Sequence, residues 1–110
     1  MSDRTLLEMA AKAAGYTCVW RGNDGDFWWH VDPDNARPWN PLTDDGDALR
    51  LAVKLGLKEG VVLEIYPRHA QTSWYKPVTD TAYIPHESDP YAATRRAIVR
   101  AAAAIGEKIP

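Results

Sequence analysis

The amino-acid sequence predicts an α+β fold, with a small, mostly antiparallel sheet of about four strands sandwiched between three helices. Three amphipathic stretches with capping residues predict the helices. Between them, short runs rich in aromatic and β-branched residues are bounded by Gly, Asn, Asp and Pro, which predicts strands. The chain has 110 residues, of which 45% are hydrophobic, so we expect a single domain spanning residues 1–110.

The first helix is expected to run from the N-terminus to about Ala14. Ser2 or Asp3 can cap its start, and Gly15 is placed to end it. Leucine and alanine residues recur at helical spacing along this stretch, which gives it one apolar side.

Residues 16–21 and 27–31 each have strand composition, and Gly-Asn-Asp-Gly at 22–25 predicts a turn that joins them into a hairpin. Trp28 and Trp29 are adjacent on the second strand, so they point to opposite faces of the sheet. A sheet covered on both sides buries both rings. The alternative is that one of them contacts a partner.

Residues 32–42 contain three prolines, which predicts a loop that continues neither neighbouring element. Thr43 or Asp44 then caps a second helix, with aspartates crowding its first turn. Gly56 is expected to close this helix. Its predicted core-facing residues are Ala48, Leu49, Ala52, Val53 and Leu55.

Residues 61–66 form a nearly continuous apolar run, which predicts a strand covered on both faces. Further short strands are expected at 73–78 and 81–85. Ser88 or Asp89 caps a third helix, with Pro90 at its first position and Gly106 at its end. Its predicted apolar face is Ala93, Ala97, Ile98, Ala101 and Ile105.

Charge and composition exclude several classes of function. No run of residues is long and apolar enough to span a membrane, and the N-terminus lacks a signal sequence, so a cytoplasmic protein is expected. Cys18 is the single cysteine, which excludes an internal disulfide. The net charge is −2 overall, but residues 1–48 carry −5 and residues 49–110 carry +3. Such asymmetry can mark a surface that binds a partner.

A small metal-assisted enzyme is one alternative, because His30 lies among several acidic residues that offer oxygen ligands. The spacing does not match a calcium-binding loop, and no catalytic or phosphate-binding motif is present. The sequence therefore predicts no metal, no cofactor and no catalytic residue. The acidic residues could instead mimic the charge of DNA; they are Asp24, Asp26, Asp32, Asp34, Asp44, Asp45 and Asp47.

Weak nucleic-acid binding is a second alternative. Arg95, Arg96 and Arg100 on the third helix could contact a phosphate backbone. The negative net charge disfavours this role, since nucleic-acid-binding domains are usually basic.

Two segments resemble parts of small phage and prophage proteins: residues 39–56, from Trp39-Asn40-Pro41-Leu42 to Leu55-Gly56, and residues 89–102, with Asp89-Pro90 and Ala93-Thr94-Arg95-Arg96. The order of elements is similar to the phage ABA sandwich domain family. That resemblance implies an α/β/α sandwich of uncharacterised function, and it implies no activity and no site residues.

The sequence thus predicts a phage or prophage accessory protein that is not an enzyme and acts by protein–protein interaction. The expected binding residues are exposed aromatic side chains, Trp39, Trp74 and Tyr75. The expected partners are a host or phage protein, or a second copy of the chain.

Overall fold

The computed structural model describes residues 2–21, 27–31, 36–74 and 80–109, and it confirms the α+β class with three helices. The helices are α1 (Asp3–Ala14), α2 (Asp45–Glu59) and α3 (Pro90–Glu107). No helix within the described ranges is long and apolar enough to cross a membrane.

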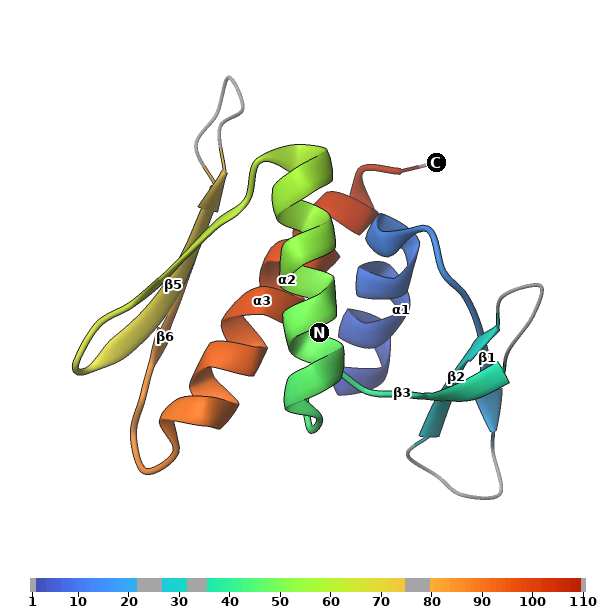
Figure 1. Cartoon of the computed structure of the whole chain (residues 1–110), viewed down its shortest axis with the longest axis horizontal. Helices are drawn as coiled ribbons and strands as arrows, with labels where there is room; N and C mark the ends of the chain where they lie inside the picture. Colours follow the sequence, from blue (N-terminus) through green and yellow to red (C-terminus); the bar gives the residue numbers. More distant parts are fainter. Residues whose placement is uncertain (1, 22–26, 32–35, 75–79, 110) are drawn as a thin grey trace.

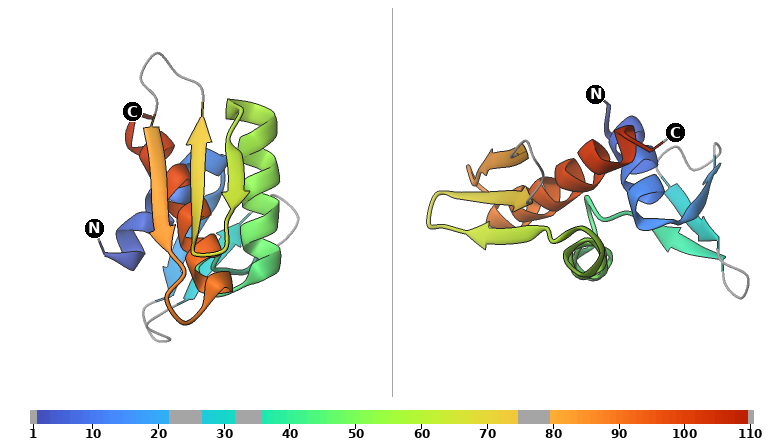
Figure 2. Two further views of the ribbon diagram at one scale, coloured as in Figure 1. Left: turned by 90° about the vertical axis from the view of Figure 1, so that its left-hand side faces the viewer. Right: turned by 90° about the horizontal axis from the view of Figure 1, so that it is seen from above.

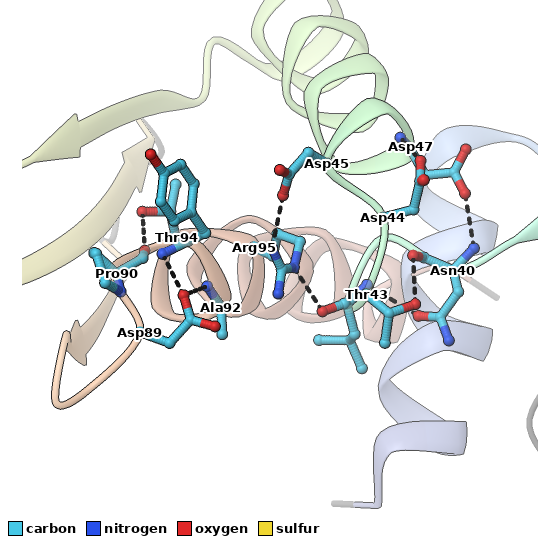
Figure 3. Close-up of polar contacts among 12 residues, drawn as sticks. Asn40, Thr43, Asp44, Asp45, Asp47, Asp89, Pro90, Ala92, Thr94 and Arg95 are labelled. Atoms are coloured by element: carbon cyan, nitrogen blue, oxygen red, sulfur yellow. Dashed lines mark hydrogen bonds and ion pairs between the residues drawn. The ribbon is translucent and has the colours of Figure 1, made fainter.

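Side-chain caps begin all three helices, as the sequence predicted. The Ser2 hydroxyl accepts a hydrogen bond from the amide of Thr5, and the Asp44 carboxylate accepts one from Asp47. Asp89 accepts from two amides of the first turn of α3 (Figure 3). These bonds satisfy backbone donors that have no partner within the helix.

Two of the predicted helix ends are wrong. α2 passes through Gly56 and ends at Gly60, whose φ of 71° is the left-handed conformation that favours glycine. The amide of Gly60 donates to the carbonyl of Gly56 and so closes the last turn. In the same way, α3 continues past Gly106 to Glu107.

The first sheet is antiparallel and has the order β1-β2-β3: β1 (Thr17–Arg21), β2 (Phe27–Val31) and β3 (Ala36–Trp39). The predicted hairpin of β1 and β2 is confirmed. β3 lies in the segment that was predicted to be a loop, with Pro38 paired opposite Trp29. The prolines led to the wrong prediction of a loop, because β3 is an edge strand, where a residue without a backbone N–H donor is tolerated.

The second sheet is also antiparallel, with the order β4-β5-β6: β4 (Val62–Ile65), β5 (His69–Trp74) and β6 (Asp80–Pro85). β5 begins four residues before the strand predicted at 73–78. β4 was expected to be covered on both faces, but it is an edge strand whose Val62 and Ile65 are exposed. Apolar composition alone did not reveal that this strand lies at the edge of its sheet.

The strands are divided between two sheets, whereas a single sheet of about four strands was expected. Figure 1 shows the helices lying between the two sheets, so the layer order differs from a sheet enclosed by helices. Each strand pairs with its neighbour in sequence, and α2 separates β3 from β4 along the chain. Two local three-stranded meanders result.

The core lies where α1, α2 and α3 meet, and the second sheet packs on α3 (Figure 1). Thr72 of β5 is fully buried, and its hydroxyl donates to the carbonyl of Ala97 at 3.1 Å, which ties the sheet to the helix. The apolar face predicted for α3 is confirmed. The main buried side chains of the helical core are Leu6, Leu7, Leu51, Leu55, Ile98, Val99 and Ile105.

Candidate interaction surface

Trp39 was predicted to be an exposed binding residue, and this prediction is wrong. Its side chain is 2% exposed, and its ring meets Tyr16 edge-on with centroids 5.6 Å apart. Burial of a large aromatic side chain contributes strongly to stability, which accounts for the position of Trp39 in the core. Trp74 ends β5, but its side chain and all of Tyr75 lie outside the described residues, as do the side chains of Trp28 and Trp29. Their predicted roles therefore stay predictions.

Arg95, one of the three arginines proposed to touch nucleic acid, joins α3 to the start of α2 (Figure 3). Its Nε donates to the carbonyl of Leu42 at 2.8 Å, and one terminal nitrogen donates to Asp45 at 2.6 Å. The arginine side chain is mostly buried. These contacts give Arg95 a structural role.

Arg96 and Arg100 do lie together, on one wall of a pocket of about 420 Å³ between the end of β6 and α3. Arg96 also donates to Asp3 at 3.1 Å, and Arg100 is exposed. Glu87 and Asp89 line the same pocket. Because these two carboxylates balance the two guanidinium groups, the pocket lacks the excess positive charge that a phosphate backbone requires.

The acidic residues at the start of α2 are used within the chain. Asp47 is buried, and it accepts hydrogen bonds from the amide of Asn40 at 2.9 Å and from Arg50 at 2.7 Å. Asp44 caps the helix, and Asp45 pairs with Arg95. These contacts account for three of the seven acids considered for charge mimicry.

All residues of the metal-assisted alternative lie outside the described structure: Asp24, Asp26, Asp32, Asp34 and the side chain of His30. Within the described ranges, no three His, Cys, Asp or Glu side chains are grouped so that they could hold a metal ion. The metal-assisted enzyme stays an untested alternative.

A row of exposed aliphatic side chains runs along the outer side of α2. Leu49, Val53 and Leu57 are 64%, 53% and 86% exposed, although leucine and valine are usually buried. Their spacing of four residues places them on one face of the helix. In Figures 1 and 2, α2 stands in front of α3, and none of the other described elements covers its outer side. We call these three residues the α2 stripe.

The sequence placed Leu49 and Val53 in the core, and this prediction is wrong. The buried face of α2 is formed by Ala48, Leu51 and Leu55 instead. α2 carries apolar residues on two sides, so periodicity alone could not select the side that faces the core. The sequence did carry a signal for a second apolar side of α2. Leu57 lies four residues after Val53, but it was not among the residues predicted to face the core.

Charged residues beside the stripe are bound by the chain itself. Arg50 makes an ion pair with Asp47 at 2.7 Å, and Lys54 Nζ lies 4.3 Å from the centroid of the Tyr16 ring. A cation over an aromatic ring is attracted by its negative face. A partner that covers the stripe therefore need not leave either of these cations unpaired.

The open face of the second sheet carries a second exposed group. The rings of Tyr66, His69 and Tyr83 stack with centroid distances of 4.8 and 4.2 Å. The Glu64 carboxylate accepts from the Tyr66 hydroxyl at 2.6 Å and from Gln71 at 3.1 Å.

These bonds lower the pKa of Glu64, with the Tyr66 hydrogen bond as the main cause and the Gln71 bond second. The same bond to Glu64 raises the pKa of Tyr66, because the hydroxyl proton is held by the carboxylate. The polar groups of Glu64, Tyr66 and Gln71 on this face thus already have partners. The α2 stripe differs, because its aliphatic side chains form no hydrogen bonds and can make only apolar contacts.

No family model, curated protein or solved structure matches this chain. The described residues form a small α+β fold in which the outer side of α2 is an exposed apolar face.

Proposed function

We propose that this chain is a protein-binding module and that it binds through the α2 stripe. The observation that carries the proposal is the exposure of Leu49, Val53 and Leu57 in one row. Single exposed aliphatic residues are common on protein surfaces, but contiguous apolar surface is typical of interaction sites. A helix that offers anchors at this spacing is a recurring mode of recognition between proteins.

The energetics favour apolar contact at this surface. Full burial of an exposed leucine or valine side chain contributes roughly 1.5–3 kcal/mol. Arg50 and Lys54 are already paired within the chain, so binding need not add the cost of burying an isolated charge. Three such anchors offset a substantial part of the entropy lost on association.

We also propose that the protein is a non-enzymatic accessory protein of a phage or prophage and acts in the bacterial cytoplasm. The support is the resemblance of residues 39–56 and 89–102 to small phage proteins. A host protein, a phage protein or a second copy of the chain is then the partner.

Capture from bacterial lysate, after nuclease treatment, tests the proposed surface. The wild-type chain is compared with Leu57→Glu, which places a charge in the stripe, and with Tyr83→Glu, which places the same charge on the exposed sheet face. We expect a defined protein, either a lysate protein or a differently tagged copy of this chain, to be retained by wild type and Tyr83→Glu. Leu57→Glu should retain at least about tenfold less, equivalent to about 1.4 kcal/mol. Equal retention by Leu57→Glu, or loss with Tyr83→Glu alone, would refute the role of the stripe.

A further inference from the structure

We propose that the pocket between the end of β6 and α3 binds a small zwitterion, a molecule of the amino-acid class that carries one carboxylate and one ammonium group. The site is separate from the α2 stripe, since none of the residues that line the pocket belongs to α2. Four features support the proposal: the size of the pocket, its balanced charge, the fixed turn that forms part of one wall, and a buried histidine nitrogen without a partner.

The pocket is large enough for a small molecule and has two distinct walls. Its volume is about 420 Å³, within the roughly 300–1,000 Å³ of small-molecule sites. One wall is α3, where Ala92, Arg96 and Arg100 follow one another at intervals of four residues and so share a helix face. The other wall is the end of β6 with the turn that leads into α3, at the lower left of Figure 1. A ligand in this pocket therefore contacts the helix on one side and the turn on the other.

The charged groups of the pocket that lack partners are one cation and one anion. Arg96 is already paired with Asp3 at 3.1 Å, and the Asp89 carboxylate is already bound to amides at the start of α3. Arg100 and Glu87 are exposed, and neither side chain makes an ion pair or a hydrogen bond with another described residue. A simple anion would leave Glu87 unpaired, and a simple cation would leave Arg100 unpaired. A molecule that carries both charges can pair with the two together.

The turn that carries Glu87 is held in place at both ends. The amide of His86 donates to the carbonyl of Arg68 at 2.8 Å, and the amide of Asp89 donates to the carbonyl of His86 at 3.2 Å. Glu87 has a φ of 53°, in the left-handed region that residues with a side chain seldom adopt. Such backbone conformations are concentrated at functional sites, where the surrounding fold holds them. The Glu87 carboxylate thus extends from a fixed backbone, which reduces the entropy lost on binding.

A buried nitrogen in the same wall indicates a polar ligand. His86 lines the pocket, and its Nε2 atom is buried without a hydrogen-bond partner in the described part of the chain. Buried polar atoms nearly always have a partner, and each exception calls for a further group such as a bound water or ion. An amino acid has many hydrogen-bonding groups for its size, so it suits this wall better than an apolar ligand does.

Titration of the wild-type chain with each of the common amino acids, followed by nuclear magnetic resonance, tests the proposal. At least one amino acid should shift the amide signals of Glu87, Ser88 and Arg100 in a saturable way at millimolar concentration. The amide signals of Leu49 and Val53 on α2 should stay constant, because they lie outside the pocket. If no amino acid gives a saturable shift at the pocket, the inference is overturned.

Two variants that each remove one charge identify the groups that hold the ligand. Arg100→Gln and Glu87→Gln should each weaken binding of the tightest amino acid about three- to tenfold, because each leaves one ligand charge unpaired. Lys58→Gln and Glu107→Gln remove the same charges from exposed positions outside the pocket and should bind as wild type does. The N-acetyl derivative of the amino acid lacks the ammonium group, so it should bind wild type more weakly, and Glu87→Gln should weaken its binding no further. Unchanged binding in Arg100→Gln or in Glu87→Gln, or equal binding of the amino acid and its N-acetyl derivative, would overturn the inference.

Discussion

At the scale of single residues, Gly106 sets the distance between α1 and α3. A Cβ atom at this position would lie 1.9 Å from the Met9 carbonyl oxygen and 2.7 Å from its carbon, so the two backbones are in direct contact here. The sequence suggested that Gly106 stops the helix. Its actual role is close packing, which periodicity along one helix does not reveal.

Gly106→Ala should lower the free energy of unfolding by at least about 2 kcal/mol, because α1 and α3 must move apart to admit the methyl group. Gly56→Ala is the matched control, since a Cβ there meets its nearest atom at an ordinary 3.4 Å. In the control, alanine should raise stability by roughly 0.5–1 kcal/mol, as it does within helices. Urea denaturation measures both. Equal effects of the two substitutions would disprove the close packing at Gly106.

Glu64 gives a second prediction at this scale. Since its pKa is lowered by the Tyr66 and Gln71 hydrogen bonds, the ionised carboxylate contributes stability above the ordinary glutamate pKa, and this contribution is lost as the pH falls through the lowered value. Tyr66→Phe should move the pKa of Glu64 back toward its ordinary value. Titration of the Glu64 carboxyl signal by nuclear magnetic resonance measures the change. An unchanged pKa in Tyr66→Phe would mean that the bond does not hold the carboxylate.

At the scale of elements, α2 combines two roles on opposite sides. Leu51 and Leu55 are fully buried in the helical core, whereas Leu49, Val53 and Leu57 face solvent. A helix with one apolar face can bury that face within its own domain. A helix with two opposite apolar faces leaves the second exposed unless a partner covers it. The second face of α2 is therefore the feature on which the proposed binding function rests.

Alanine substitutions separate these two sides. Leu55→Ala should cost about 2–5 kcal/mol, because it removes buried side-chain atoms and leaves a cavity. Leu57→Ala should change the stability of the monomer by no more than about 0.5 kcal/mol. Denaturation at low protein concentration, where any dimer dissociates, gives both values. A large loss of stability in Leu57→Ala would show that the stripe belongs to the core.

Arg95 connects two elements, and its removal tests that connection. Arg95→Ala should lower stability by about 1–3 kcal/mol, because the Leu42 carbonyl and Asp45 lose a charged donor. The neighbouring Arg100→Ala removes an exposed arginine from the same helix and should change stability by less than about 0.5 kcal/mol. If Arg95→Ala is as stable as Arg100→Ala, the link that Arg95 makes between α3 and α2 contributes nothing to the stability of the fold.

At the scale of the whole molecule, local signals predicted the elements better than their assembly. The caps at Ser2, Asp44 and Asp89 and the β1–β2 hairpin depend on neighbouring residues, and they could be predicted. Division of the strands into two sheets depends on contacts between distant segments, which the pattern of one chain does not encode directly.

The candidate site was missed for a related reason. Exposed tryptophans were expected, but Trp39 is enclosed by the core. The stripe went unrecognised because leucine and valine at helical spacing usually indicate a buried face. Exposure of Leu57 follows only from where α1 and α3 lie, and so it required the three-dimensional structure.

The most direct test of the central claim, that the α2 stripe is the binding surface, is the capture experiment with wild type, Leu57→Glu and Tyr83→Glu. We predict that wild type and Tyr83→Glu retain the same protein and that Leu57→Glu retains at least about tenfold less of it. Equal retention by Leu57→Glu and wild type would contradict the claim that the stripe makes the contact.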